Sequence, residues 1–174
     1  MKIIAFAGSN SAQSINKKLA TYAAGLFDNA STEILDLNDF ELPLYSVDRE
    51  KELGQPQLAK DFLDKLASAD IIVLSLAENN GNYSSAFKNI FDWCSRIRKD
   101  VFQNKPMLLM ATSPGERGGQ SALEIAGENL SRYGAEIKSV FSLPSFNDNF
   151  NTESNTISNP DLDQKLRDII SGLQ

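Results

Sequence analysis

The sequence has 174 residues, of which 41% are hydrophobic and 23% charged, and this balance predicts a globular protein with a substantial core. The net charge is −6 and no basic block occurs, which argues against nucleic-acid binding because that function requires clustered Lys and Arg. Histidine is absent and Cys94 is the only cysteine, which excludes imidazole catalysis, histidine-ligated metals and an internal disulfide.

Apolar stretches are all shorter than the roughly 20 residues that a membrane-spanning helix needs. The apolar run at the N-terminus is also too short for the core of a signal peptide. A single cysteine is typical of proteins kept in a reducing compartment. We therefore expect a cytoplasmic protein that does not associate with a membrane.

Apolar strands alternate with amphipathic helices along the chain. Strands are expected at 2–7, 32–37, 70–76, 106–112 and 137–142, and helices at 15–28, 56–68, 84–98, 118–133 and 160–172. The first, third and fourth strands are nearly continuously apolar, as in strands covered on both faces, whereas the second and fifth interleave polar residues, as edge strands do. The pattern predicts an α/β fold with a doubly wound five-stranded parallel sheet, order 2-1-3-4-5, and helices on both faces. Residues 1–174 are expected to form a single domain, and the six-stranded Rossmann order fits less well because only five strands are evident.

The first loop of interest, GSNSAQSIN (8–16), joins the first strand to the first helix. Ser9 and Ser11 offer hydroxyl donors, and Ser14 is suited to cap the helix, with the N–H groups of residues 15–17 directed into the loop. Such a helix start favours a phosphate, which would also offset Lys17 and Lys18 in the first turn. The loop matches neither GxGxxG nor GxxxxGK[ST]. On spacing alone, a phosphate site and an ordinary capped loop are equally well supported.

Two further loops follow the third and fourth strands, at the same edge of the sheet. In AENNGNYSSA (77–86), the backbone around Gly81 is suited to the edge of a planar heterocycle, although these residues alone favour a polar turn that caps the third helix. In TSPGERGGQS (112–121), Gly118 and Gly119 permit close approach of the backbone to a ring, and the alternative is a flexible connection. The three loops together indicate a ligand site more strongly than any one of them.

Four segments, in order over residues 3–145, resemble motifs of the NAD(P)H-dependent FMN reductase family. The first loop is similar to its GSxRxxSxN phosphate loop, and LPLYSVDRE (42–50) to its LPxYxxD segment. AENNGNYSSAFKNIFDW (77–93) resembles PEYNGSxPGxLKNxxDW, and SPGERGGQSALEIAGENLSRYGAEI resembles SxGxxGGxxAxxxLxxxLxxxGA. The resemblance implies a flavodoxin-like, FMN-dependent oxidoreductase. It would take hydride from NAD(P)H and pass electrons to a small acceptor such as a flavin, a quinone, an azo compound or a metal ion.

The resemblance also implies which residues bind FMN. The phosphate would lie at the first loop, on Ser9, Asn10, Ser11, Ser14, Ile15 and Asn16. The isoalloxazine would meet the second loop at Glu78, Asn79, Asn80, Gly81 and Asn82, and the third at Ser113, Gly118 and Gly119. No residue is expected to act as a catalytic acid or base, because the flavin itself accepts the hydride, and no metal site is expected.

Several positions depart from the family motifs. Ser11 replaces an arginine, so that Lys17 or Lys18 would have to supply the charge at the phosphate. Ala77, Asn79 and Ser84 replace a proline, a tyrosine and a second proline. These departures predict a weakly held flavin. They also leave open a family-derived domain that has lost flavin binding. A flavodoxin-type electron carrier is disfavoured, because the loop lacks the T-x-T-G-x-T pattern.

Assembly is a further expectation. Members of the family often dimerise through the third helix and its neighbour, which implies a homodimer or homotetramer here. The apolar stripe of that helix is expected to pack in the core. Trp93 lies beside the stripe and is a candidate interface anchor if exposed, whereas Cys94 lies on the stripe and is expected to be buried and inert. Tyr45 and Asp48 line either the site or a partner subunit. Residues 145–159 are expected to form a long polar surface loop, anchored to the core by Phe146 and Phe150.

Overall fold

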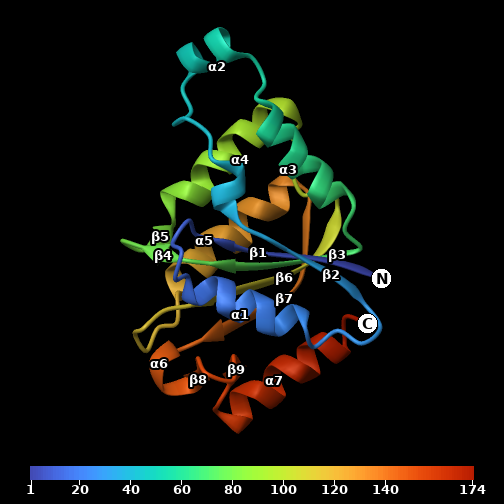
Figure 1. Cartoon of the computed structure of the whole chain (residues 1–174), viewed down its shortest axis with the longest axis vertical. Coiled ribbons are helices and arrows are strands. Elements are labelled where there is room, and N and C mark those ends of the chain that lie inside the picture. The colour runs from blue at the N-terminus through green and yellow to red at the C-terminus, as the bar shows by residue number, and fades with distance from the viewer.

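A parallel sheet of five strands forms the centre of the computed structural model, which describes residues 1–174. Its strands are β1 (Lys2–Gly8), β2 (Ser31–Leu35), β3 (Ile71–Leu76), β6 (Lys105–Thr112) and β7 (Ala135–Leu143). Their order is β2-β1-β3-β6-β7, and every neighbouring pair is parallel (Figure 1). The predicted flavodoxin-like order 2-1-3-4-5 is confirmed. The predicted edges are confirmed too, since β2 and β7 have exposed or half-buried side chains where β3 is buried throughout.

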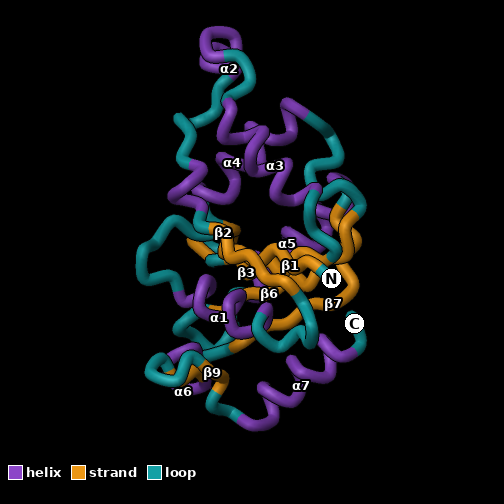
Figure 2. The backbone as a smooth tube through the Cα atoms, turned by 45° about the vertical axis from the view of Figure 1, so that its right-hand side comes forward, coloured by secondary structure: helices purple, strands orange, loops and turns teal.

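Helices cover both faces of this sheet (Figures 1 and 2). On one face lie α1 (Ile15–Ala24) and α7 (Pro160–Ser171); on the other lie α3 (Gln57–Ala67), α4 (Ser85–Ile97) and α5 (Gln120–Leu130). Each face has its own apolar core, one around Leu19 and Leu166, the other around Phe62 and Phe87. No helix is long and apolar enough to cross a membrane.

Shorter elements account for the remaining ordered structure. They are α2 (Val47–Leu53), α6 (Phe146–Asn149), the hairpins β4 (Glu78–Asn79) with β5 (Asn82–Tyr83) and β8 (Phe150–Asn151) with β9 (Thr156–Ile157), and 3-10 turns at Leu37–Phe40 and Ser131–Tyr133. The expectation of one long surface loop at 145–159 was therefore wrong, because α6 and the β8–β9 hairpin fall within it. Strands of two residues are too short to produce a periodic pattern. The predicted anchoring by Phe146 and Phe150 is confirmed, since both rings are buried and stack with centroids 4.7 Å apart.

Residues 41–56, which we call the α2 arm, extend beyond the rest of the molecule at the top of Figure 1. Trp93 lies beneath the base of this arm, 1% exposed, and its indole Nε1 donates a hydrogen bond to the carbonyl of Pro43 at 2.8 Å. The Tyr45 ring packs edge-on against it, 5.2 Å away. Trp93 is therefore not an exposed interface anchor in this chain, because the arm folds back over α4. Cys94 is fully buried, as expected, and burial raises the pKa of its thiol to about 12.

Candidate functional site

The three predicted loops meet at the carboxyl edge of the sheet, where they enclose an open cavity of about 230 Å³ that we call the loop cavity. β1 and β3 are neighbours in the sheet, and the helices that follow them, α1 and α4, lie on opposite faces. Open α/β sheets bind ligands at such a switch point. The cavity is lined by Ser9, Ser11, Gln13, Ser14, Ile15, Asn16, Ala77, Glu78, Asn79, Thr112, Ser113 and Pro114.

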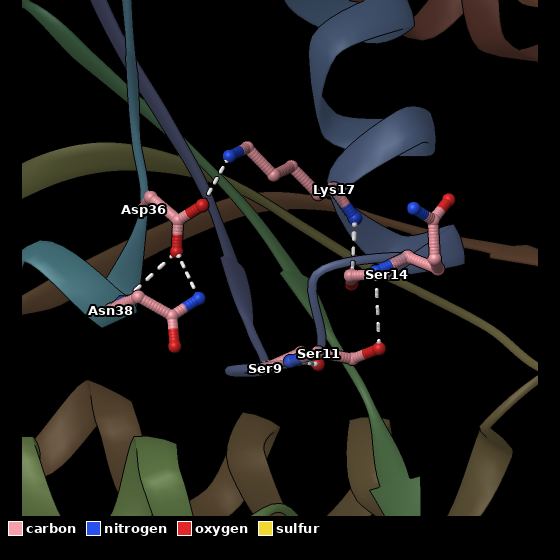
Figure 3. A network of polar contacts seen from close by, with 7 residues as sticks. Ser9, Ser11, Ser14, Lys17, Asp36 and Asn38 are labelled. Atoms are coloured by element: carbon pink, nitrogen blue, oxygen red, sulfur yellow. Dashed lines mark hydrogen bonds and ion pairs between the residues drawn. The ribbon is translucent and has the colours of Figure 1, made fainter.

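The serines of the first loop are held by its own backbone (Figure 3). Ser9 Oγ accepts a hydrogen bond from the N–H of Ser11 at 3.2 Å, and Ser11 Oγ accepts one from the N–H of Gln13 at 3.3 Å. Ser14 Oγ caps α1 by accepting from the N–H of Lys17 at 3.1 Å. None of these hydroxyls donates a hydrogen bond within the protein. Each oxygen is therefore fixed in place while its proton remains available to a ligand.

The N-terminus of α1 supplies two further donors. The backbone N–H groups of Ile15 and Asn16 have no acceptor within the protein, as is usual in the first turn of a helix. The N–H of Lys17, predicted to be free, is bonded to Ser14. Two amides and three hydroxyls, all uncharged, thus converge on one wall of the loop cavity.

Lys17 does not supply charge to this wall. Its ammonium forms an ion pair with Asp36, directly after β2, and Figure 3 shows the side chain running away from the serines toward that carboxylate. Asp36 also accepts hydrogen bonds from the backbone and side-chain N–H groups of Asn38, at 2.9 and 2.7 Å. The hydrogen bond from Lys17, with those from Asn38, lowers the pKa of Asp36. Asp36, rather than a bound anion, offsets the lysine at the start of the helix.

Asn16 has a structural role that sequence reasoning did not anticipate. Its side chain is 2% exposed, and its Oδ1 accepts hydrogen bonds from Ser75 Oγ at 2.7 Å and from the N–H of Thr112 at 3.0 Å. Its Nδ2 donates to the carbonyl of Thr112 at 3.1 Å. These bonds tie the start of α1 to the ends of β3 and β6, so the Asn16 side chain braces the wall of the cavity.

The second loop forms the β4–β5 hairpin. Asn80 and Gly81 make its two-residue turn with φ angles of 52° and 76°, the left-handed pair typical of an Asn-Gly type I′ turn. Asn80, Gly81 and Asn82 are exposed at the tip, outside the loop cavity, which only Glu78 and Asn79 of this hairpin line. Glu78 Oε2 accepts the N–H of Ala122 at 3.1 Å, which caps α5 at a point where Gly119 has no side chain to do so.

Of the three predicted residues of the third loop, one lines the loop cavity and two do not. Ser113 lines the cavity, but Gly118 and Gly119 are buried behind it. A Cβ atom on Gly118 would lie 2.9 Å from the backbone nitrogen of Pro144, and one on Gly119 would lie 2.7 Å from Ala111 Cβ. Both glycines have positive φ angles. They are therefore required for packing of the loop against the sheet.

The structure explains one of the departures from the family motifs, Ser84. Ser84 caps α4 by accepting from the N–H of Phe87, and donates to the carbonyl of Gly8 at 2.8 Å. It thereby joins the second loop to the first. Tyr83 is buried and packs edge-on against Phe87, so it does not place an aromatic ring in the loop cavity.

Asn10, the remaining predicted residue of the first loop, lies outside the loop cavity. It is exposed and lines a separate cavity of about 240 Å³, beside Leu44 and Ile90.

The chemistry available at the loop cavity is that of binding. Glu78 is the only carboxylic acid in its lining, and no basic side chain lines it. Neutral hydroxyl and amide donors at a helix N-terminus suit an anionic group such as a phosphate. The remaining walls are built from Ala77, Asn79 and Pro114, which suit an uncharged, flat group.

Comparison with known proteins finds relatives over most of the chain. The sequence model of the NADPH-dependent FMN reductase family matches residues 1–148. A 2-hydroxy-1,4-benzoquinone reductase of Burkholderia is 33% identical over 120 residues, 68% of this chain. An NAD(P)H-dependent FMN reductase of Pseudomonas aeruginosa is 29% identical over 119 residues, also 68% of this chain. Each match spans 63% of the relative's own length.

Solved structures share the fold over nearly the whole chain. A flavoenzyme NAD(P)H:(acceptor) oxidoreductase from Paracoccus denitrificans superposes with a TM-score of 0.78 at 21% identity, covering 98% of this chain and 93% of its own. An FMN-dependent NADH-azoreductase from Bacillus anthracis, solved in complex with FMN, has a TM-score of 0.67 at 14% identity and covers 99% of both chains. At these identities the superpositions establish the fold.

Proposed function

The chain belongs to the NADPH-dependent FMN reductase family, and we propose that it binds FMN in the loop cavity, takes hydride from NAD(P)H and passes electrons to a small acceptor. The observation that carries the proposal is the convergence of three loops, predicted separately from sequence, on one cavity at the switch point of the sheet. The same 174 residues would act as one flavodoxin-like domain.

The phosphate end of FMN fits the first loop. We assign it to the hydroxyls of Ser9, Ser11 and Ser14 and to the N–H groups of Ile15 and Asn16, which have no competing acceptor in the protein. Because Lys17 is paired with Asp36, no charge-assisted bond reaches this phosphate from a lysine of the cavity wall. We therefore expect FMN to bind with a micromolar rather than nanomolar dissociation constant and to exchange with solution.

The flavin ring fits the opposite side of the cavity, between the hairpin and the third loop. Ala77, Glu78 and Asn79 would border it on one side, and Ser113 with Pro114 on the other. The exposed hairpin tip, with Asn80, Gly81 and Asn82, would lie near the solvent edge of the ring. Bound flavin supplies the hydride chemistry, and the chain binds and orients it. This division suits a cavity without histidine or a basic side chain.

Quinones are named as the substrates of two of the relatives. The Burkholderia relative is a 2-hydroxy-1,4-benzoquinone reductase, and an Escherichia coli relative, 32% identical over 79 residues, is a quinone reductase. A quinone is flat and small enough to approach a flavin from the open side of the loop cavity. We propose a quinone as the terminal acceptor, with flavins, azo compounds and metal ions as competitors to be assayed beside it.

The test is an anaerobic titration of FMN-loaded protein with NADPH and with NADH. The proposal predicts loss of the oxidised-flavin absorbance in proportion to added coenzyme, at a rate far above that of free FMN, and its return when a quinone is added. Bound flavin that stays oxidised would contradict the reductase function. Absence of FMN binding at high flavin concentration would favour the alternative, a family-derived domain that has lost its cofactor.

Assembly through the α2 arm is part of the proposal. No residue of α2 is buried, and Leu44, Val47 and Leu53 are 69%, 57% and 53% exposed. Three large apolar side chains on one projecting segment are typical of a protein interface. We propose that the arms of two copies pack together in a homodimer. Sedimentation should then show a dimer that Val47→Asp converts to monomer and Glu52→Ala, on the same helix, does not; a wild-type monomer would contradict the dimer.

A further inference from the structure

A second, larger cavity runs along the exposed face of α1 and begins where the loop cavity ends. Its volume is about 580 Å³, within the range of small-molecule sites. The two cavities share Gln13 and Ser14, so the larger one, which we call the α1 groove, starts at the helix cap. It continues past Thr21 to Gly25, eleven residues further on, which at 1.5 Å per residue is about 16 Å.

From this continuity we propose that the α1 groove accepts the adenosine phosphate half of FAD, so that the protein binds FAD as well as FMN. The inference rests on the proposed flavin site, because it needs the flavin phosphate at the N–H groups of Ile15 and Asn16. In FAD a second phosphate and an adenosine extend from that phosphate. The groove is the cavity adjoining it on the solvent side of α1.

Charge in the groove agrees with a phosphate there. Lys18 lines it and forms no ion pair, whereas the neighbouring Lys17 is bound to Asp36. In a protein of net charge −6, an unpaired ammonium at the end of a phosphate loop is the local feature that favours an anion. Gln13, Thr21 and Asn155 add neutral hydrogen-bonding groups suited to a ribose.

The far end of the groove is apolar, and its aromatic side chain is fixed by contacts with neighbouring residues. Leu26 lines it together with the Tyr22 ring, which packs edge-on against Phe150 at 6.2 Å. The Tyr22 hydroxyl donates to Asp163 of α7 and accepts a hydrogen bond from Arg167 Nη2 at 3.0 Å. A fixed aromatic side chain beside open apolar surface suits a flat adenine base. Asn155, in the turn between β8 and β9, forms the opposite wall.

The experiment is isothermal titration of the full chain with FMN and with FAD, for the wild type and two variants. Lys18→Glu reverses the charge in the groove. Lys60→Glu makes the same change in net charge on α3, which packs on the other face of the sheet. The proposal predicts that FAD binds at least as tightly as FMN. It further predicts that Lys18→Glu raises the dissociation constant of FAD about fivefold, and more than that of FMN, whereas Lys60→Glu changes neither.

Three results would overturn the inference. The first is FMN binding with FAD excluded, and the second is an equal loss of both flavins in Lys18→Glu. The third is an effect of Lys18→Glu on the KM for NADPH alone, which would assign the groove to the adenosine half of the nicotinamide coenzyme. Failure of both flavins to bind would overturn the proposed function as well, so the two failures are distinguishable.

Discussion

Asn16 stands at a position that the family motif marks as a ligand contact, yet the polar atoms of its side chain form hydrogen bonds within the protein. It makes three hydrogen bonds to Ser75 and Thr112 and is 2% exposed. The residue lies in the first turn of α1, at the end of the first loop. The bonds to β3 and β6 join residues 59 and 96 positions apart, and no local pattern predicts such contacts.

Replacing Asn16 with alanine should destabilise the protein even without flavin. The change leaves the Ser75 hydroxyl and the Thr112 N–H buried without partners, and we expect a loss of about 2–3 kcal/mol in the free energy of unfolding. Asn10→Ala, in the same loop but exposed, should cost less than about 0.5 kcal/mol. Urea unfolding of both variants checks the difference, and equal stabilities would contradict the bracing role.

Cys94 should be chemically inert in the folded protein. Its sulfur is fully buried and lies 3.6 Å from the carbonyl of Ala59, and the pKa of about 12 leaves almost no thiolate near pH 8. Iodoacetamide should therefore label the thiol completely in guanidinium chloride and not at all in buffer over the same time. Rapid labelling of native protein would show that α4 opens far more readily than its packing indicates.

At the scale of elements, the long strands and helices were predictable because each carries a period of apolar residues over ten or more positions or a continuous apolar run. The two hairpins were not, since β4, β5, β8 and β9 have two residues each. The α2 arm was missed for a related reason. Its helix buries no side chain and therefore has no apolar face to detect.

Two glycines test the conformation assigned to the β4–β5 turn. Neither Gly81 nor Gly127 would meet another atom within 4 Å if a Cβ were added, but Gly81 has a φ of 76° whereas Gly127 lies within α5. Gly81→Ala should cost about 1 kcal/mol because the left-handed region disfavours a Cβ. Gly127→Ala should stabilise by about 1 kcal/mol through helix propensity. Urea unfolding measures both, and a neutral Gly81→Ala would argue against the type I′ turn.

For the whole molecule, ion pairs near β2 contribute to the response to acid. Hydrogen bonds from Lys65 lower the pKa of Glu33, and those from Lys17 lower the pKa of Asp36. A carboxyl whose pKa is lower in the folded state contributes stability above its unfolded pKa, and loses it as the pH falls through the folded value. Because the chain has no histidine, side chains should leave stability nearly constant between about pH 5 and 8.

We therefore expect the urea midpoint to stay level across that range and to fall below about pH 4.5. In Asp36→Asn the midpoint should be lower at neutral pH and should fall less steeply in acid, because one carboxyl with a lowered pKa has been removed. An identical acid limb in the variant and the wild type would show that the Lys17–Asp36 pair contributes nothing to folding.

Amide chemical shifts of ¹⁵N-labelled protein titrated with FMN test directly whether FMN binds in the loop cavity. We expect the largest chemical-shift changes at the amides of Ile15 and Asn16, with further changes at residues 77–82 and 112–115 around the loop cavity. Residues of α3, on the opposite side of the sheet from α1, should not shift. Changes concentrated elsewhere, such as around Asn10 and Ile90, or none at saturating FMN, would contradict the site described.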